Sequence, residues 1–132
     1  MTVDIKSAAK KIDELSKTYG LNVDPYSKIE DISVGMQQRV EILKMLYRNA
    51  EVLIFDEPTA VLTPQEIDDL IKIMQNLINE GKSIILITHK LKEIKAAADR
   101  CTVIRRGKCI GTVDVKTTTE ADMAKMMVGR QV

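Results

Sequence analysis

The hydrophobic positions of the first fifty residues recur with the spacing of amphipathic helices. The first helix is expected from Asp4 to Tyr19, and Gly20 is well placed to end it. A linker of residues 21–32, broken by Asp24-Pro25, follows. Ser33 is suited to the N-cap of a second helix. The apolar stripe expected on that helix consists of Met36, Val40, Leu43 and Tyr47.

The pattern changes after residue 47. Val52–Phe55 and Ser83–Thr88 are short apolar runs, typical of strands buried on both faces of a parallel sheet. Between them, Thr63-Pro64-Gln65-Glu66 is a capping box that opens a helix, with Gly81 as its stop. The positions of that helix expected to face inward are Ile67, Leu70, Ile71, Met74, Leu77 and Ile78.

Shorter elements follow. A short helix with Leu91 and Ile94 precedes two strands, around 102–104 and 109–113, that are joined at Gly107. Thr117-x-x-Glu120 is expected to cap a final helix. The methionines expected on that helix are Met123, Met126 and Met127. The alternation of strands and helices predicts an α/β fold with a mainly parallel sheet over residues 48–132, and residues 1–47 are expected to form a separate helical subdomain.

Composition narrows the possible classes of protein. The chain has 132 residues, of which 45% are hydrophobic and 30% charged, which favours a globular, soluble domain. The net charge of +1 and the aromatic content of 3% argue against a nucleic-acid partner. No apolar run approaches the roughly 20 residues that span a bilayer, and the first ten residues do not resemble a signal peptide, so we expect a cytoplasmic location. Cys101 and Cys109 are expected to be buried, reduced thiols, with a disulfide or half a metal site as the alternative.

Polar residues follow both apolar strands, at the edge where open parallel sheets bind ligands. The first strand is followed by Asp56 and Glu57, and the second by Thr88 and His89. Asp56 is suited to orient a Mg²⁺ ion, Glu57 to accept a proton from an attacking water, and His89 to steady the charge on a transferred phosphoryl group. Taken singly, the two carboxylates also suit a solvated turn, and the histidine a structural role.

The start of the second helix is a candidate anion site. Ser33-Val34-Gly35 combines a serine cap with a small residue, which leaves backbone N–H groups and the positive end of the helix dipole facing outward. An ordinary helix start is the alternative reading of the same residues.

In order and spacing, these segments resemble the ATP-binding-cassette (ABC) ATPases. Residues 32–39 (Ile-Ser-Val-Gly-Met-Gln-Gln-Arg) resemble the family signature, 52–57 its Walker B strand with the adjacent catalytic glutamate, 58–63 its D-loop, and His89 its switch histidine. Val34, Met36 and Thr63 depart from the commonest pattern, which has Gly, Gln and Asp there. The variant motifs are similar to the first cassette of importers for simple sugars and nucleosides, and residues 127–130 (Met-Val-Gly-Arg) resemble the end of that cassette.

The resemblance implies a partial P-loop NTPase core, RecA-like, that works with ATP and Mg²⁺. It implies that Glu57 and His89 are catalytic and that Asp56 holds Mg²⁺ through water. It also implies that Ser33, Gly35 and Gln37 contact the γ-phosphate of ATP held by an opposite cassette. The expected partners are the membrane permease subunits and a second cassette, at the cytoplasmic face of the membrane.

The phosphate-binding loop of the family, G-x-x-x-x-G-K-[ST], does not occur in the sequence, and neither does the glutamine loop. We therefore expect a truncated cassette that does not bind or hydrolyse ATP alone. Its sheet is expected to have a gap or an exposed edge, and the chain to self-associate or to be marginally stable. A non-catalytic interaction fragment, docking on a transporter subunit or an intact cassette, is the alternative. An ABC ATPase of DNA repair or translation is a third reading, which the near-neutral charge disfavours.

Overall fold

The computed structural model describes residues 4–26, 28 and 33–129. Ile32 and Arg130, at the outer ends of two motifs quoted above, lie outside the described residues. The chain divides into two compact units, residues 1–85 and 86–132, which are described separately below. The expected boundary between a helical subdomain and a core at residue 47 stays a prediction.

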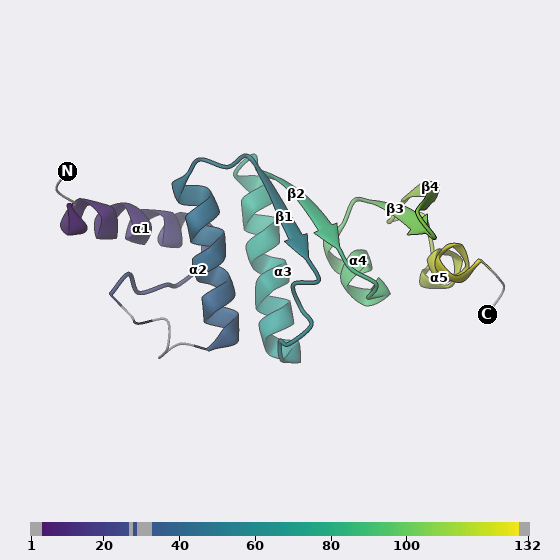
Figure 1. Cartoon of the computed structure of the whole chain (residues 1–132), viewed down its shortest axis with the longest axis horizontal. Coiled ribbons are helices and arrows are strands. Elements are labelled where there is room, and N and C mark those ends of the chain that lie inside the picture. The colour runs from purple at the N-terminus through teal and green to yellow at the C-terminus, as the bar shows by residue number, and fades with distance from the viewer. Residues whose placement is uncertain (1–3, 27, 29–32, 130–132) are drawn as a thin grey trace. The chain divides into compact units, whose positions relative to one another are not determined.

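The first unit begins with two helices at the expected places (Figure 1). Helix α1 spans Ile5–Tyr19 and is capped by Asp4, whose side chain accepts a hydrogen bond from the Ser7 N–H. The hydrogen bonds from Ser7 lower the pKa of Asp4. Gly20 ends the helix in the left-handed conformation, with φ of 70°. Helix α2 spans Val34–Tyr47 with Ser33 as its N-cap, so both predicted helices are confirmed.

Two strands and a long helix follow, and the second strand extends two residues beyond the first unit. Strand β1 (Val52–Asp56) pairs with β2 (Ser83–Ile87) in a two-stranded parallel sheet, and the Ser83 N–H donates to the Glu51 carbonyl at 2.9 Å. Helix α3 (Pro64–Asn79) runs between them in sequence and lies alongside β1 in Figure 1. The α/β fold class is confirmed.

Burial on both faces of the strands, however, is a wrong prediction. In β1 the side chains alternate: Leu53 and Phe55 are buried, whereas Val52 and Ile54 are 55% and 59% exposed. In β2, Ile85 is likewise exposed. A continuous apolar run is compatible with burial on both faces of a strand, but in this chain only one face of β1 is covered.

The helices of the first unit bury faces that differ in part from the predicted ones. In α2 the buried residues are Ile42, Leu43 and Leu46. Of the predicted stripe only Leu43 is buried, because the stripe borders an open groove beside the linker, lined by Met36, Val40 and Tyr47 among others. The buried residues of α3 are Leu70, Ile73, Met74 and Leu77. Three of these were predicted, but Ile73 was missed, and the predicted Ile78 is exposed.

The second unit holds the smaller elements. Helix α4 spans Leu91–Ala97, strands β3 (Arg100–Arg105) and β4 (Lys108–Asp114) form an antiparallel hairpin, and α5 spans Glu120–Val128. The hairpin turns at Arg106 and Gly107, which both have positive φ, as the favoured two-residue turns require. The hydrophobic core of the second unit includes Ile94, Val115 and Met123. The described strands fall into two separate sheets, β1-β2 and β3-β4, in agreement with the expected interruption.

Two details of the second unit correct the sequence analysis. The cap of α5 is Thr119, whose hydroxyl accepts from the Asp122 N–H at 3.1 Å, whereas the Thr117 hydroxyl donates to the Asp114 carbonyl. The cysteines are free as predicted, but the expected burial is wrong: Cys109 is exposed, opposite the exposed Ile104 in the hairpin, and Cys101 is only half-buried. Partial burial raises the pKa of Cys101. Among the described residues no helix is long and apolar enough to cross a membrane.

Candidate functional site

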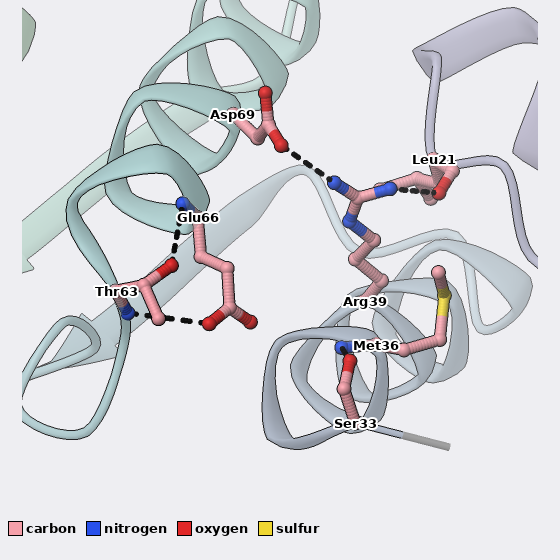
Figure 2. A network of polar contacts seen from close by, with 7 residues as sticks. All are labelled: Leu21, Ser33, Met36, Arg39, Thr63, Glu66 and Asp69. Carbon is pink, nitrogen blue, oxygen red and sulfur yellow. Dashed lines mark hydrogen bonds and ion pairs between the residues drawn. The ribbon is translucent and has the colours of Figure 1, made fainter.

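The N-terminus of α2 presents the signature-like residues. Ser33 is exposed, and its hydroxyl accepts a hydrogen bond from the Met36 N–H at 3.1 Å (Figure 2). Its carbonyl accepts the first helical bond, from the Gln37 N–H at 2.9 Å. Gly35 lies in the first turn and is half-buried. This first turn therefore places Ser33 at the surface, where helix N–H groups and the helix dipole favour an anion.

The first turn of α3 lies beside this helix start, within the same unit (Figure 2). Thr63 and Glu66 form the predicted capping box: the Glu66 N–H donates to the Thr63 hydroxyl, and the Glu66 carboxylate accepts from the Thr63 N–H, each at 3.2 Å. The same carboxylate lies against Gly35. A cavity of about 110 Å³ remains between the two helices. Its polar lining comes from Ser33, Gln38, Arg39 and Glu66.

Arg39 joins three parts of the unit. Its Nη1 donates to the carbonyl of the buried Leu21 at 2.8 Å, just beyond the end of α1. Its Nη2 lies 3.6 Å from the Asp69 carboxylate on α3, as Figure 2 shows. The Arg39 side chain is 18% exposed and that of Asp69 43%. Arg39 thus fixes the lateral position of α2 against both neighbouring helices.

The carboxylates predicted for catalysis lie at the end of β1. Asp56 is the last residue of the strand and is exposed, and Glu57 follows it, half-buried. Glu57 has φ of 46°, in the left-handed region that costs a non-glycine residue about 1–2 kcal/mol. Such a conformation persists where the surroundings hold it, and it is commonest at functional sites.

The turn after Glu57 is held from α2. The Gln38 side-chain amide donates to the Pro58 carbonyl at 2.7 Å. The next residue, Thr59, is 3% exposed, and the Ala60 N–H donates back to the Glu57 carbonyl at 3.4 Å. A buried threonine and a hydrogen bond from another helix therefore fix the segment that carries Glu57.

His89 belongs to the second unit, in the turn between β2 and α4. It is exposed, and the neighbouring Lys90 N–H donates to the Thr88 hydroxyl at 3.1 Å. The structure therefore brings Ser33, Gly35, Gln37, Asp56 and Glu57 into one unit. The predicted meeting of His89 with the two carboxylates stays a prediction.

The site includes contacts that the sequence analysis did not identify. Gln38 and Arg39 were part of the quoted signature, but no role was assigned to either. Glu66 was identified only as a helix cap, and Asp69 not at all. Position in the signature was the one available signal for Gln38 and Arg39. The contact of Glu66 with Gly35 joins residues 31 positions apart and has no local sequence signal.

The donor set suits a magnesium ion that arrives with a phosphate ligand. Among the residues that the structure describes, no group of three or more His, Cys, Asp and Glu side chains could hold a metal ion. Mg²⁺ is commonly bound by one or two carboxylates together with substrate phosphates and waters. Asp56, an exposed carboxylate at the carboxyl end of a strand, fits that kind of site.

Solved structures define the class of the fold. The chain is similar to CbiO1 from Clostridium perfringens, part of the ABC transporter complex cbiONQ, with a TM-score of 0.76 and 26% identity over 97% of this chain and 50% of that one. It has the fold of MJ1267, an ATP-binding cassette of an ABC transporter, with a TM-score of 0.80 and 20% identity over 98% of this chain and 51% of that one. The architecture is therefore a partial P-loop NTPase core of the cassette type.

Sequence comparison gives the family. Residues 1–60 match the family model described as ABC transporter. The chain is 66% identical over its whole length to the nucleoside import ATP-binding protein NupA of Lactococcus lactis, and covers 26% of it. It is 61% identical to the guanosine import ATP-binding protein NupO of Bacillus subtilis, over 98% of this chain and 26% of that protein. The chain thus spans about a quarter of the length of these relatives. Over its whole length the chain is therefore similar to ATP-binding proteins of ABC transporters.

Proposed function

We propose that this chain is part of the ATP-hydrolysing subunit of an ABC importer that takes up a simple sugar or a nucleoside. The observation that carries the proposal is the direct hydrogen bond between the signature-like helix and the turn after the Walker B-like strand, from Gln38 to Pro58. The relatives named for nucleoside and guanosine import support it, as does a glucose import ATP-binding protein of Haloferax volcanii, 53% identical over 93% of this chain and 22% of that protein.

In this proposal the signature-like helix contacts the γ-phosphate of ATP held by a second, opposite cassette. Ser33 contributes its exposed hydroxyl at the helix start, and Gly35 allows close approach of the backbone. Gln37, two residues after Gly35 on the same helix, contributes a polar side chain to this contact. The positive end of the α2 dipole favours this negatively charged ligand.

The carboxylates at the end of β1 act on the ATP that this cassette holds. Glu57 accepts a proton from the water that attacks the γ-phosphorus, while the bond from that phosphorus to the bridging oxygen breaks and ADP leaves. Asp56 would hold the Mg²⁺ ion through water. His89 donates a hydrogen bond to the γ-phosphate oxygens as charge develops on them. The Mg²⁺ ion, when bound with ATP, neutralises part of the phosphate charge.

The 132-residue chain alone is proposed not to bind or hydrolyse ATP. Its sequence contains no G-x-x-x-x-G-K-[ST] loop, whose backbone N–H groups and lysine cradle the phosphates in P-loop NTPases. The proposed partners are a second cassette and the permease subunits, with the protein peripheral on the cytoplasmic face of the membrane. Nucleic acid is not a proposed partner.

One observation favours a second candidate function, a non-catalytic interaction fragment. The uncovered face of β1 exposes Val52 and Ile54, and such apolar surface commonly marks a protein contact. In this reading the chain docks on an intact cassette or a transporter subunit without taking part in hydrolysis.

Transport separates the two candidates. The complete ATP-binding protein that carries this chain is reconstituted with its permease and binding subunits in vesicles loaded with Mg-ATP. Uptake of labelled nucleosides and simple sugars is then measured for the wild type and for Glu57→Gln, which keeps the shape of the side chain and removes the base. ATP-dependent uptake that Glu57→Gln abolishes supports the importer. Uptake unaffected by Glu57→Gln contradicts it and favours the interaction fragment.

A further inference from the structure

Gln38 lies on the signature-like helix, but its side chain forms a hydrogen bond outside that helix. Its side-chain N–H donates to the carbonyl of Pro58, 20 residues further along the chain, at 2.7 Å. The distance lies at the short end of the range for N–H···O hydrogen bonds. Gln38 and Pro58 are both half-buried, so this contact is shielded in part from competing water.

The segment that receives this bond is in an unfavourable conformation. Glu57 has φ of 46°, although a residue that precedes proline is normally extended. Proline has no backbone N–H, so the polar group that Pro58 offers to a neighbour is its carbonyl. The Gln38 amide satisfies that carbonyl and thereby fixes the peptide unit between Pro58 and Thr59, one residue beyond Glu57.

We infer that Gln38 is a positioning residue for hydrolysis: it holds the left-handed turn that aims the Glu57 carboxylate. The inference rests on the proposed function. The hydrogen bond would also couple two ATP sites. Helix α2 is proposed to contact the ATP of the opposite cassette, whereas Glu57 acts on the ATP of the cassette to which this chain belongs. A shift of α2 when the opposite nucleotide binds or leaves would move the Pro58 carbonyl and with it Glu57.

The neighbouring contacts make α2 a rigid carrier of such a shift. Arg39, the next residue, anchors the helix to the Leu21 carbonyl at 2.8 Å and to Asp69 at 3.6 Å. Gln38 and Arg39 thus connect one turn of α2 to the turn after β1 on one side and to α1 and α3 on the other. Displacement of the helix start is therefore transmitted to the Glu57 turn through the Gln38 side chain.

The inference is tested on the complete ATP-binding protein, assembled with its partner subunits, with Gln38→Glu. This substitution keeps the size and replaces the donating amide by a carboxylate, which repels the carbonyl. Gln75→Glu is the matched control, because Gln75 is exposed on α3 and the chemical change is the same. We expect kcat to fall about tenfold or more in Gln38→Glu while KM for ATP changes less than about twofold, since misplacement of a catalytic group slows chemistry more than binding. We also expect the Hill coefficient for ATP to fall toward one, which a purely structural role would not produce.

A second measurement follows the turn itself. Hydrogen exchange at the Ala60 amide, which donates to the Glu57 carbonyl, is compared in the 132-residue chain for the wild type, Gln38→Glu and Gln75→Glu. Faster exchange in Gln38→Glu alone supports the inference. If Gln38→Glu does not fold, Gln38→Met replaces it, because methionine has a similar length, suits a helix and cannot donate.

The outcomes separate the two proposals. A wild-type assembly without ATPase activity overturns the proposed function, and the exchange measurement then decides whether Gln38 holds the turn. An active wild type with unchanged kcat in Gln38→Glu overturns the inference and leaves the proposed function standing. Equal exchange at Ala60 in all three chains likewise overturns it.

Discussion

The carboxylate of Glu66 lies directly against the backbone of Gly35, so that a Cβ atom at position 35 would overlap its Oε2 atom. The first turns of α2 and α3 are therefore in contact through a glycine and a carboxylate, and that carboxylate is at the same time held by the Thr63 N–H at 3.2 Å. Gly35 is in the ordinary helical region, so close approach, and not backbone conformation, is the reason for a glycine here.

Gly35→Ala is expected to act through Glu66. In the middle of a helix alanine is more stable than glycine by roughly 0.5–1 kcal/mol, which is the upper limit of the gain expected at Gly35 in the first turn. In the wild-type chain this gain should be lost, because the added methyl group displaces the Glu66 carboxylate from the capping box. In a Glu66→Ala background the gain should reappear, giving a coupling free energy of about 1 kcal/mol or more in a double-mutant cycle measured by urea unfolding. Effects of the two substitutions that add within roughly 0.5 kcal/mol would contradict the contact.

Arg39→Met is expected to destabilise the chain more than Asp69→Asn. Arg39→Met leaves the buried Leu21 carbonyl without its charged donor, and hydrogen bonds to charged groups contribute about 1.5–3 kcal/mol. Asp69→Asn weakens only an ion pair of 3.6 Å with a 43% exposed carboxylate, so its cost should stay below about 1 kcal/mol. The free energies of unfolding of both variants check this order, and the reverse order would show that the ion pair is the stronger anchor.

Thr119→Ala is expected to lower the free energy of unfolding by about 1 kcal/mol, as loss of an N-cap side chain does. Thr117→Ala is the matched control, two residues away, whose hydroxyl makes only a 3.4 Å hydrogen bond to the Asp114 carbonyl. Its effect should remain within about 0.5 kcal/mol. Equal losses in the two variants would mean that the capping box expected at Thr117 also operates.

The positions of the helices and strands were predictable from the sequence, but which of their faces are buried was not. The capping box at Thr63 and the glycine stop at Gly20 are coded within a few residues, and both were predicted correctly. The apolar runs at 52–55 and 83–88 were also found as strands. Whether both faces of such a strand are covered depends on other parts of the molecule, which is why Ile54 was wrongly expected to be buried.

The candidate site shows the same division. Ser33, Asp56 and Glu57 were identified because each follows a readable boundary, a helix start or a strand end. The hydrogen bond from Gln38 to Pro58 joins two elements 20 residues apart, so it required the packing of α2 against the turn after β1. The left-handed conformation of Glu57 also has no sequence signal, since glutamate rarely adopts it.

The uncovered face of β1 predicts concentration-dependent self-association of the 132-residue chain. Ile54 is 59% exposed within a strand, and exposed apolar strands favour pairing between chains. Ile54→Lys should shift the chain toward monomer in sedimentation velocity, while a lysine at another exposed position, Gln75→Lys on α3, should not. A wild-type chain that stays monomeric across the concentration range would contradict this prediction.

The most direct test of the central claim is Mg-ATP hydrolysis, measured side by side for the isolated 132-residue chain, for the complete ATP-binding protein assembled with its partners, and for the Glu57→Gln variant of each. We expect no hydrolysis by the isolated chain and hydrolysis by the complete assembly. Glu57→Gln should lower the activity of that assembly at least about a hundredfold, in line with removal of a general base. Hydrolysis by the isolated chain that Glu57→Gln abolishes would contradict the claim that its ATP site is incomplete. Hydrolysis by the assembly that survives Glu57→Gln would contradict the role assigned to the turn after β1.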